Sequence, residues 1–110
     1  MSQFDEFIGL VLANGKMLAK DLFAGFVQNA EDDIRAFLDS LEADLRTWTQ
    51  LLADGDLTRL EFEDLVKGSA DLAELAALTR AGIALAQLER FRSGLIEIVT
   101  NAAFDVFWPI

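Results

Sequence analysis

The chain has 110 residues, a size typical of a single domain, and its 19 acids and 9 bases give a net charge of −10. This acidic balance argues against nucleic acid and anionic membranes as partners. The absence of histidine, cysteine and tyrosine removes the commonest general base, the thiol nucleophile and the sulfur ligands of metals, so we expect a non-enzyme with no cofactor or metal.

The first half of the chain carries an apolar residue every three or four positions, which is the spacing of one helical face. At 1.5 Å per residue the predicted helix, about residues 3–53, would be roughly 75 Å long. Asn29 is followed by three acids, a pattern typical of a helix N-cap. The sequence therefore leaves open whether 3–53 is one helix, bent near Asn29, or two. Gly15 and Gly25 lie on or beside the apolar face, where we expect close packing of a neighbouring helix.

The clearest interruption of the helical pattern is Asp54-Gly55-Asp56, where Gly55 favours a left-handed turn. Thr58 with Glu61 forms the pattern of a capping box, which predicts a short helix over 58–67 that ends at Gly68. The apolar periodicity then predicts a last long helix over 70–107.

The segment from Asp54 to Phe62 resembles the second half of an EF-hand calcium loop, with Gly55 and Glu61 at matching positions. The same register places Leu52 where an oxygen ligand is required, and an aliphatic side chain cannot supply one. A turn followed by a capping box accounts for the whole pattern, so we expect no calcium site.

These elements predict an all-α fold in a single domain, residues 1–110. We expect an elongated hairpin of two long helices joined by one short helix. With 53% hydrophobic residues and a mean hydropathy of +0.29, such a hairpin would leave apolar surface uncovered. We therefore expect it to pack into a multi-chain helical bundle. Charges interrupt every long apolar run, which argues against integral membrane insertion.

The residues expected at an interface between chains are large apolar side chains on the helical faces and at the C-terminus. They are Phe4, Phe7, Val11, Leu18, Leu22, Phe26, Ile34, Trp48, Phe91, Phe104, Phe107, Trp108 and Ile110. Three cations interrupt the last apolar helix, and we expect Arg80, Arg90 and Arg92 to form ion pairs across such an interface.

Two functions fit this sequence. The first is a non-catalytic structural protein that self-assembles through its apolar helix faces into a homo-oligomer or a larger assembly. The alternative is a small acidic binding module, of the immunity, anti-regulator or adaptor type, that covers a basic or apolar surface on another protein. Residues 31–64 hold eleven acids and three arginines, which would direct such a module to a basic partner. The acidic N-terminal residues and the lack of cysteine favour a cytoplasmic location.

Overall fold

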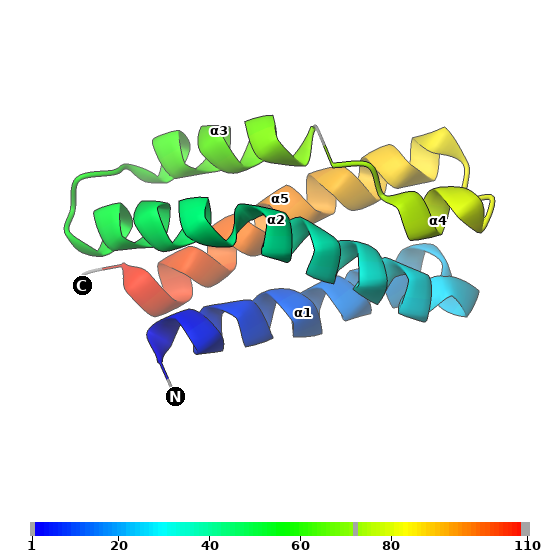
Figure 1. Cartoon of the computed structure of the whole chain (residues 1–110), viewed down its shortest axis with the longest axis horizontal. Helices are drawn as coiled ribbons and strands as arrows, with labels where there is room; N and C mark the ends of the chain where they lie inside the picture. Colours follow the sequence, from blue (N-terminus) through cyan, green and yellow to red (C-terminus); the bar gives the residue numbers. More distant parts are fainter. Residues whose placement is uncertain (1, 72, 109–110) are drawn as a thin grey trace.

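The protein forms a bundle of helices in a computed structural model that describes residues 2–71 and 73–108 (Figure 1). The elements in chain order are α1 (Gln3–Leu22), the 3-10 turn η1 (Ala24–Phe26), α2 (Val27–Ala53), α3 (Arg59–Ala70), α4 (Ala76–Arg80) and α5 (Leu85–Phe107). No strand occurs in these residues, so the all-α prediction is confirmed. Helix α1 packs against α5 and α2, and α3 packs mainly against α5.

The predicted helix over 3–53 is divided in two, and the break lies at Phe23 rather than near Asn29. Phe23 leaves the helical conformation (φ −154°, ψ 75°), and its buried ring packs against Phe91 of α5 with centroids 5.5 Å apart. The chain then reverses through η1, so α2 runs back along α1 (Figure 1). The two halves of the apolar face therefore cover each other and α5. This reversal explains why the molecule is only 42 Å long.

The predicted helix over 70–107 is wrong, because the chain leaves the helical path twice. Helix α3 continues through Gly68 to Ala70, and the short α4 follows after a connection. Gly82 takes a positive φ of 87° and directs the chain into α5. The hairpin of two long helices is thus replaced by three long helices, with α3 and α4 lying along them.

Two local predictions are confirmed. Gly55 adopts the left-handed conformation (φ 78°), and Thr58 and Glu61 form the complete capping box at the start of α3. The close approach at Gly15 is also present, since a β-carbon there would lie 2.6 Å from Ile34 Cδ1. The close packing predicted at Gly25 is absent, because a β-carbon there would meet nothing within 4 Å.

The apolar core runs the length of the bundle and contains side chains from every helix longer than one turn. Its largest fully buried members include Phe7, Phe62 and Phe91. The accessible surface is 6253 Å², close to the roughly 6,100 Å² expected for a compact monomer of 12.2 kDa. The radius of gyration, 13.6 Å, also matches the roughly 13 Å of a compact chain of this length. A single chain therefore buries or partly buries most of the apolar residues that we expected to contact other chains.

Candidate binding pocket and surfaces

The residues predicted at an interface fall into three groups. Five of them lie inside the core of this single chain: Phe4, Phe7, Val11, Ile34 and Phe91. Each of the five is less than a tenth exposed, so its side chain packs inside this chain. The apolar periodicity of these five residues therefore reflects packing within one chain.

A second group is partly buried and packs against that core: Leu18, Leu22, Trp48, Phe104 and Phe107. Phe107 belongs with Phe7, whose ring it meets edge-on with centroids 5.9 Å apart. Among the predicted residues that the structure describes, only Phe26 and Trp108 are exposed, at 37% and 40%. Ile110 lies outside the described residues.

The three predicted interface cations do not all behave alike. Arg92 pairs with Glu89 on its own helix, at 2.5 Å, and its Nη2 donates to the backbone carbonyl of Ala73. It therefore ties α5 to the connection before α4 instead of reaching another chain. Arg80 and Arg90 are exposed, and neither forms an ion pair with a side chain in residues 2–71 and 73–108.

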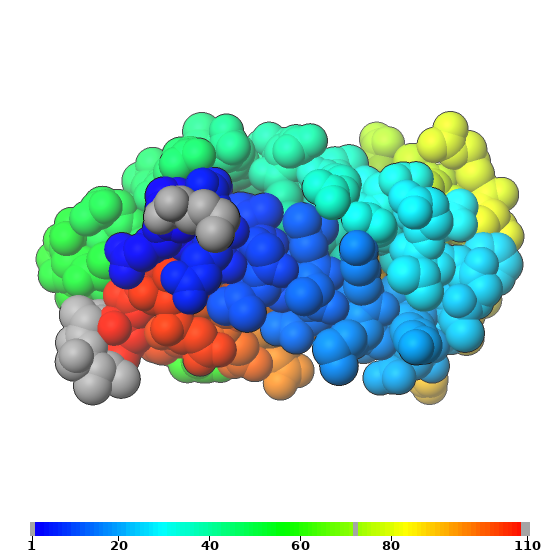
Figure 2. Space-filling model, turned by 90° about the horizontal axis from the view of Figure 1, so that it is seen from below, coloured from blue at the N-terminus to red at the C-terminus, as the bar shows by residue number. Residues whose placement is uncertain are grey.

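The end of α5 carries an aromatic pair, Phe104 and Trp108, which we call the aromatic tip. The two rings stack with centroids 4.8 Å apart, and the guanidinium of Arg59 lies over Phe104, 4.9 Å from its centroid. Arg59 also donates to Asn101 Oδ1, which fixes the start of α3 on α5. Figure 2 shows the last turns of α5 beside α1 on the lower face of the molecule. The tip is thus an apolar surface where the start of α3 meets the end of α5.

The acidic band, residues 31–64, covers α2, the turn after it and the start of α3, so it occupies one side of the bundle (Figure 1). Glu31 accepts from Arg35 at 3.0 Å and pairs with Lys16 of α1 at 3.2 Å, and these contacts lower its pKa. The pKa of Glu61 is lowered by its hydrogen bonds with Thr58. Most other carboxylates of the band, such as Asp39, Asp44 and Asp64, are exposed.

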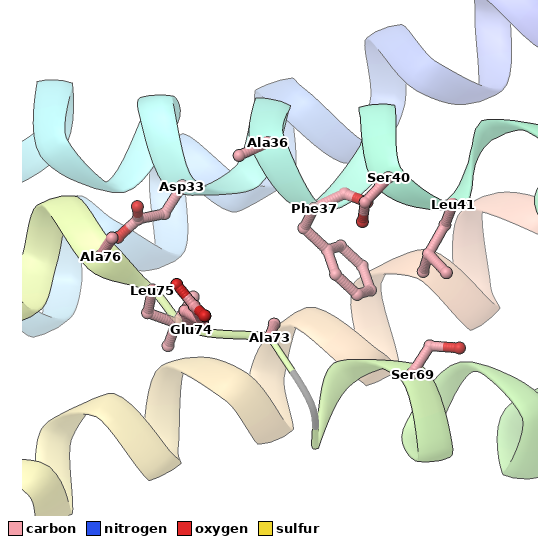
Figure 3. Close-up of a pocket in the computed structure, with 10 residues that line it drawn as sticks. All are labelled: Asp33, Ala36, Phe37, Ser40, Leu41, Ser69, Ala73, Glu74, Leu75 and Ala76. Carbon is pink, nitrogen blue, oxygen red and sulfur yellow. The ribbon is translucent and has the colours of Figure 1, made fainter.

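A cavity of about 440 Å³ opens between α2, the end of α3 and residues 73–76 (Figure 3). Figure 3 shows the side chains of Phe37 and Leu41 pointing from α2 toward this space. Together with Leu75 they form an apolar floor. The remaining lining residues are small or oxygen-bearing: Asp33, Ala36, Ser40, Ser69, Ala73, Glu74 and Ala76. No lysine or arginine is among these ten residues, so the rim offers acceptors and negative charge.

The wall of the cavity formed by residues 73–76 is held from two sides. Asp33 accepts from the backbone N–H groups of Ala77 and Leu78, each at 2.9 Å, and so caps α4 from α2. On the other side Arg92 holds the carbonyl of Ala73. Between these anchors Leu75 adopts a left-handed conformation (φ 47°, ψ 48°), which costs a non-glycine residue about 1 kcal/mol or more. The anchors therefore maintain a strained wall beside the cavity.

Sequence reasoning did not identify this cavity. The sequence predicts Asp33, with its neighbours, in the charged first turn of a helix. The available signal was its position, since an acid four residues before Phe37 and three after Ala30 stands beside the apolar face. Glu74 and Ser69 carried no comparable signal.

The described residues hold no group of three or more acidic side chains placed to bind a metal ion. In the EF-hand-like segment, Leu52 is fully buried and the carboxylate of Glu61 accepts from the backbone of Thr58. None of the helices in residues 2–71 and 73–108 has both the length and the apolar character needed to cross a bilayer. Comparison with protein-family models, curated proteins and solved structures gave no match.

Proposed function

We propose that this protein is a non-catalytic binding module that covers a basic surface on another protein. The observation that carries the proposal is the placement of the acidic band on one side of a bundle whose dimensions are those of a compact monomer. The other two long helices, α1 and α5, are nearly balanced in charge. A one-sided negative potential attracts and orients a positively charged partner. The lack of histidine, cysteine and tyrosine supports a role without catalysis.

The test compares two triple variants of equal charge change. The first neutralises exposed acids of the band, with Asp39→Asn, Asp44→Asn and Asp64→Asn. The control neutralises exposed acids elsewhere, with Asp21→Asn, Glu97→Gln and Asp105→Asn. A protein captured from a lysate on the wild type is purified, and its affinity for each variant is measured by calorimetry at low and high salt.

The proposal predicts a complex whose affinity falls with added salt and is about tenfold weaker for the band variant than for the control. Equal affinities for the two variants, or an affinity that salt does not change, would contradict it.

Self-assembly is a second candidate, and the aromatic tip is the observation that favours it. Trp108 is 40% exposed although it is held in place by stacking on Phe104. Exposed aromatic side chains on rigid elements are frequent anchors of protein contacts. If the tip joins copies of this chain, Trp108→Ala will reduce the sedimenting mass of the concentrated protein. An unchanged mass would exclude the tip as the contact.

A further inference from the structure

We propose that the cavity between α2, α3 and residues 73–76 is a specificity pocket for a lysine or arginine side chain of the partner protein. This inference rests on the proposed function, because it names the part of a basic partner that enters the acidic side of the chain. The argument depends on the chemistry of the lining and on the charge around its opening.

The floor of the cavity suits the aliphatic stem of a basic side chain. Lysine and arginine bury their methylene groups against apolar surface while the charged head stays near water. Phe37, Leu41 and Leu75 supply such a surface. The volume, about 440 Å³, falls in the roughly 300–1,000 Å³ range of pockets that hold ligands. A neighbouring apolar side chain of the partner can therefore enter with the basic one.

The rim suits a cationic head. Glu74 is exposed, and its carboxylate makes no hydrogen bond or ion pair in the part of the chain that the structure describes. Ser40 donates its proton to the carbonyl of Phe37 at 2.8 Å, so its oxygen is presented as an acceptor. Asp33 adds negative charge, although its two oxygens already accept from α4. An ammonium or guanidinium group finds acceptors here, whereas a carboxylate would be repelled.

The surroundings favour a protein segment over a free amine. The cavity opens beside the acidic band, since five of its lining residues belong to α2. A partner segment with further basic residues gains from these neighbouring charges, and a small amine does not. We therefore assign the cavity to a side chain that is presented by a basic protein surface.

The first experiment titrates the ¹⁵N-labelled full chain with blocked peptides and follows backbone amide shifts. The probe is Gly-Leu-Lys-Leu-Gly. One comparison peptide replaces lysine with norleucine, which keeps the stem and removes the charge, and another replaces it with glutamate. Butylamine is the small-molecule comparison. We expect the lysine peptide to shift amides at Ala36, Ser40 and residues 73–76, and to bind at least about fivefold tighter than the other three probes. Shifts that avoid these residues, or equal binding of butylamine, would overturn the inference.

The second experiment uses two pairs of variants with the same peptide. Glu74→Lys reverses the charge at the rim, and Asp105→Lys makes the same change on α5, outside the lining. Ala73→Phe fills the cavity, and Ala13→Phe adds the same ring to an exposed position of α1. We expect each pocket variant to bind at least about fivefold more weakly than its control. Equal binding within both pairs would overturn the inference, and the Glu74 pair decides the result if Ala73→Phe does not fold.

The purified partner separates this inference from the proposed function. If the pocket variants bind the partner as tightly as the wild type while the band variant does not, the pocket is wrong and the binding module stands. If neither set of variants changes the affinity, both are wrong.

Discussion

Gly94 of α5 lies directly against the side chain of Leu18 of α1. A β-carbon at position 94 would lie 2.5 Å from Leu18 Cδ2 and 3.3 Å from Cδ1. Because carbon atoms do not approach that closely, the missing side chain allows α1 and α5 to pack at their present distance. All the atoms within reach belong to the branched end of Leu18, so a β-carbon at position 94 requires that side chain to shift.

We therefore expect Gly94→Ala to lower the free energy of unfolding by about 1 to 2 kcal/mol, because overpacking outweighs the helix propensity of alanine. Gly68→Ala is the matched control, since Gly68 lies within α3 and a β-carbon there meets nothing within 4 Å. It should stabilise the protein by about 0.5 to 1 kcal/mol. Urea titration measures both. A stabilising effect at both positions would show that the helices at Gly94 are further apart.

Asp33 should be much more important for stability than its neighbour Asp32. Asp33→Ala removes two charged hydrogen bonds to α4 and leaves the buried N–H of Leu78 without a partner, which we expect to cost about 2 to 3 kcal/mol. Asp32 is exposed and accepts from Gln28, so Asp32→Ala should change stability by less than about 0.5 kcal/mol. Hydrogen exchange at Ala77 and Leu78 should become faster in the Asp33 variant alone. Equal exchange in both variants would show that Asp33 does not hold α4.

Phe107 and Trp108 should differ in their contribution to stability, because Phe107 packs against the core and Trp108 lies on the surface. Phe107 meets Phe7 inside the bundle, so Phe107→Ala should cost about 2 kcal/mol or more. Trp108→Ala should cost about 1 kcal/mol, because it removes an exposed stack on Phe104. Thermal unfolding of the two variants provides the comparison. A larger loss at Trp108 would place the tip in the core.

The lowered pKa of Glu61 predicts a dependence of stability on pH. A carboxyl group whose pKa is lowered by folding stabilises the native state above its ordinary value of 4.5, and this contribution is lost as the pH falls through the lower native value. Glu61→Gln keeps an acceptor for the N–H of Thr58 but does not titrate, so its stability should fall less steeply with acid than that of the wild type. Urea midpoints at a series of pH values measure the slope. The control is Asp64→Asn, at an exposed position on the same helix, and an equal slope for the two variants would contradict the prediction.

The turn after α2 and the start of α3 could be predicted from sequence, because the residues that cause them are neighbours in the chain. Gly55 and the Thr58–Glu61 capping box are neighbours in sequence, so their geometry could be read from residue type and spacing. The contact at Gly15 also followed from the apolar periodicity. These signals located the end of α2 and the start of α3.

The position of the first helix break and the start of α4 have distant causes, whereas the turn at Gly82 has a local one, the positive φ of a glycine. No glycine or proline stands at Phe23, which leaves the helix where its ring packs against Phe91, 68 residues further along the chain. The start of α4 depends on Asp33, 44 residues before Ala77. The apolar periodicity continues through both breaks, because the helices on either side of each break bury an apolar face in the same core. The cavity could not be predicted either, since its wall exists only after both breaks have formed.

Sedimentation equilibrium of the purified chain over a wide concentration range tests most directly whether one copy covers its own apolar surface. The structure predicts a single species with the mass of one chain, 12.2 kDa, at low and intermediate concentrations. A defined larger assembly that persists on dilution would contradict this account.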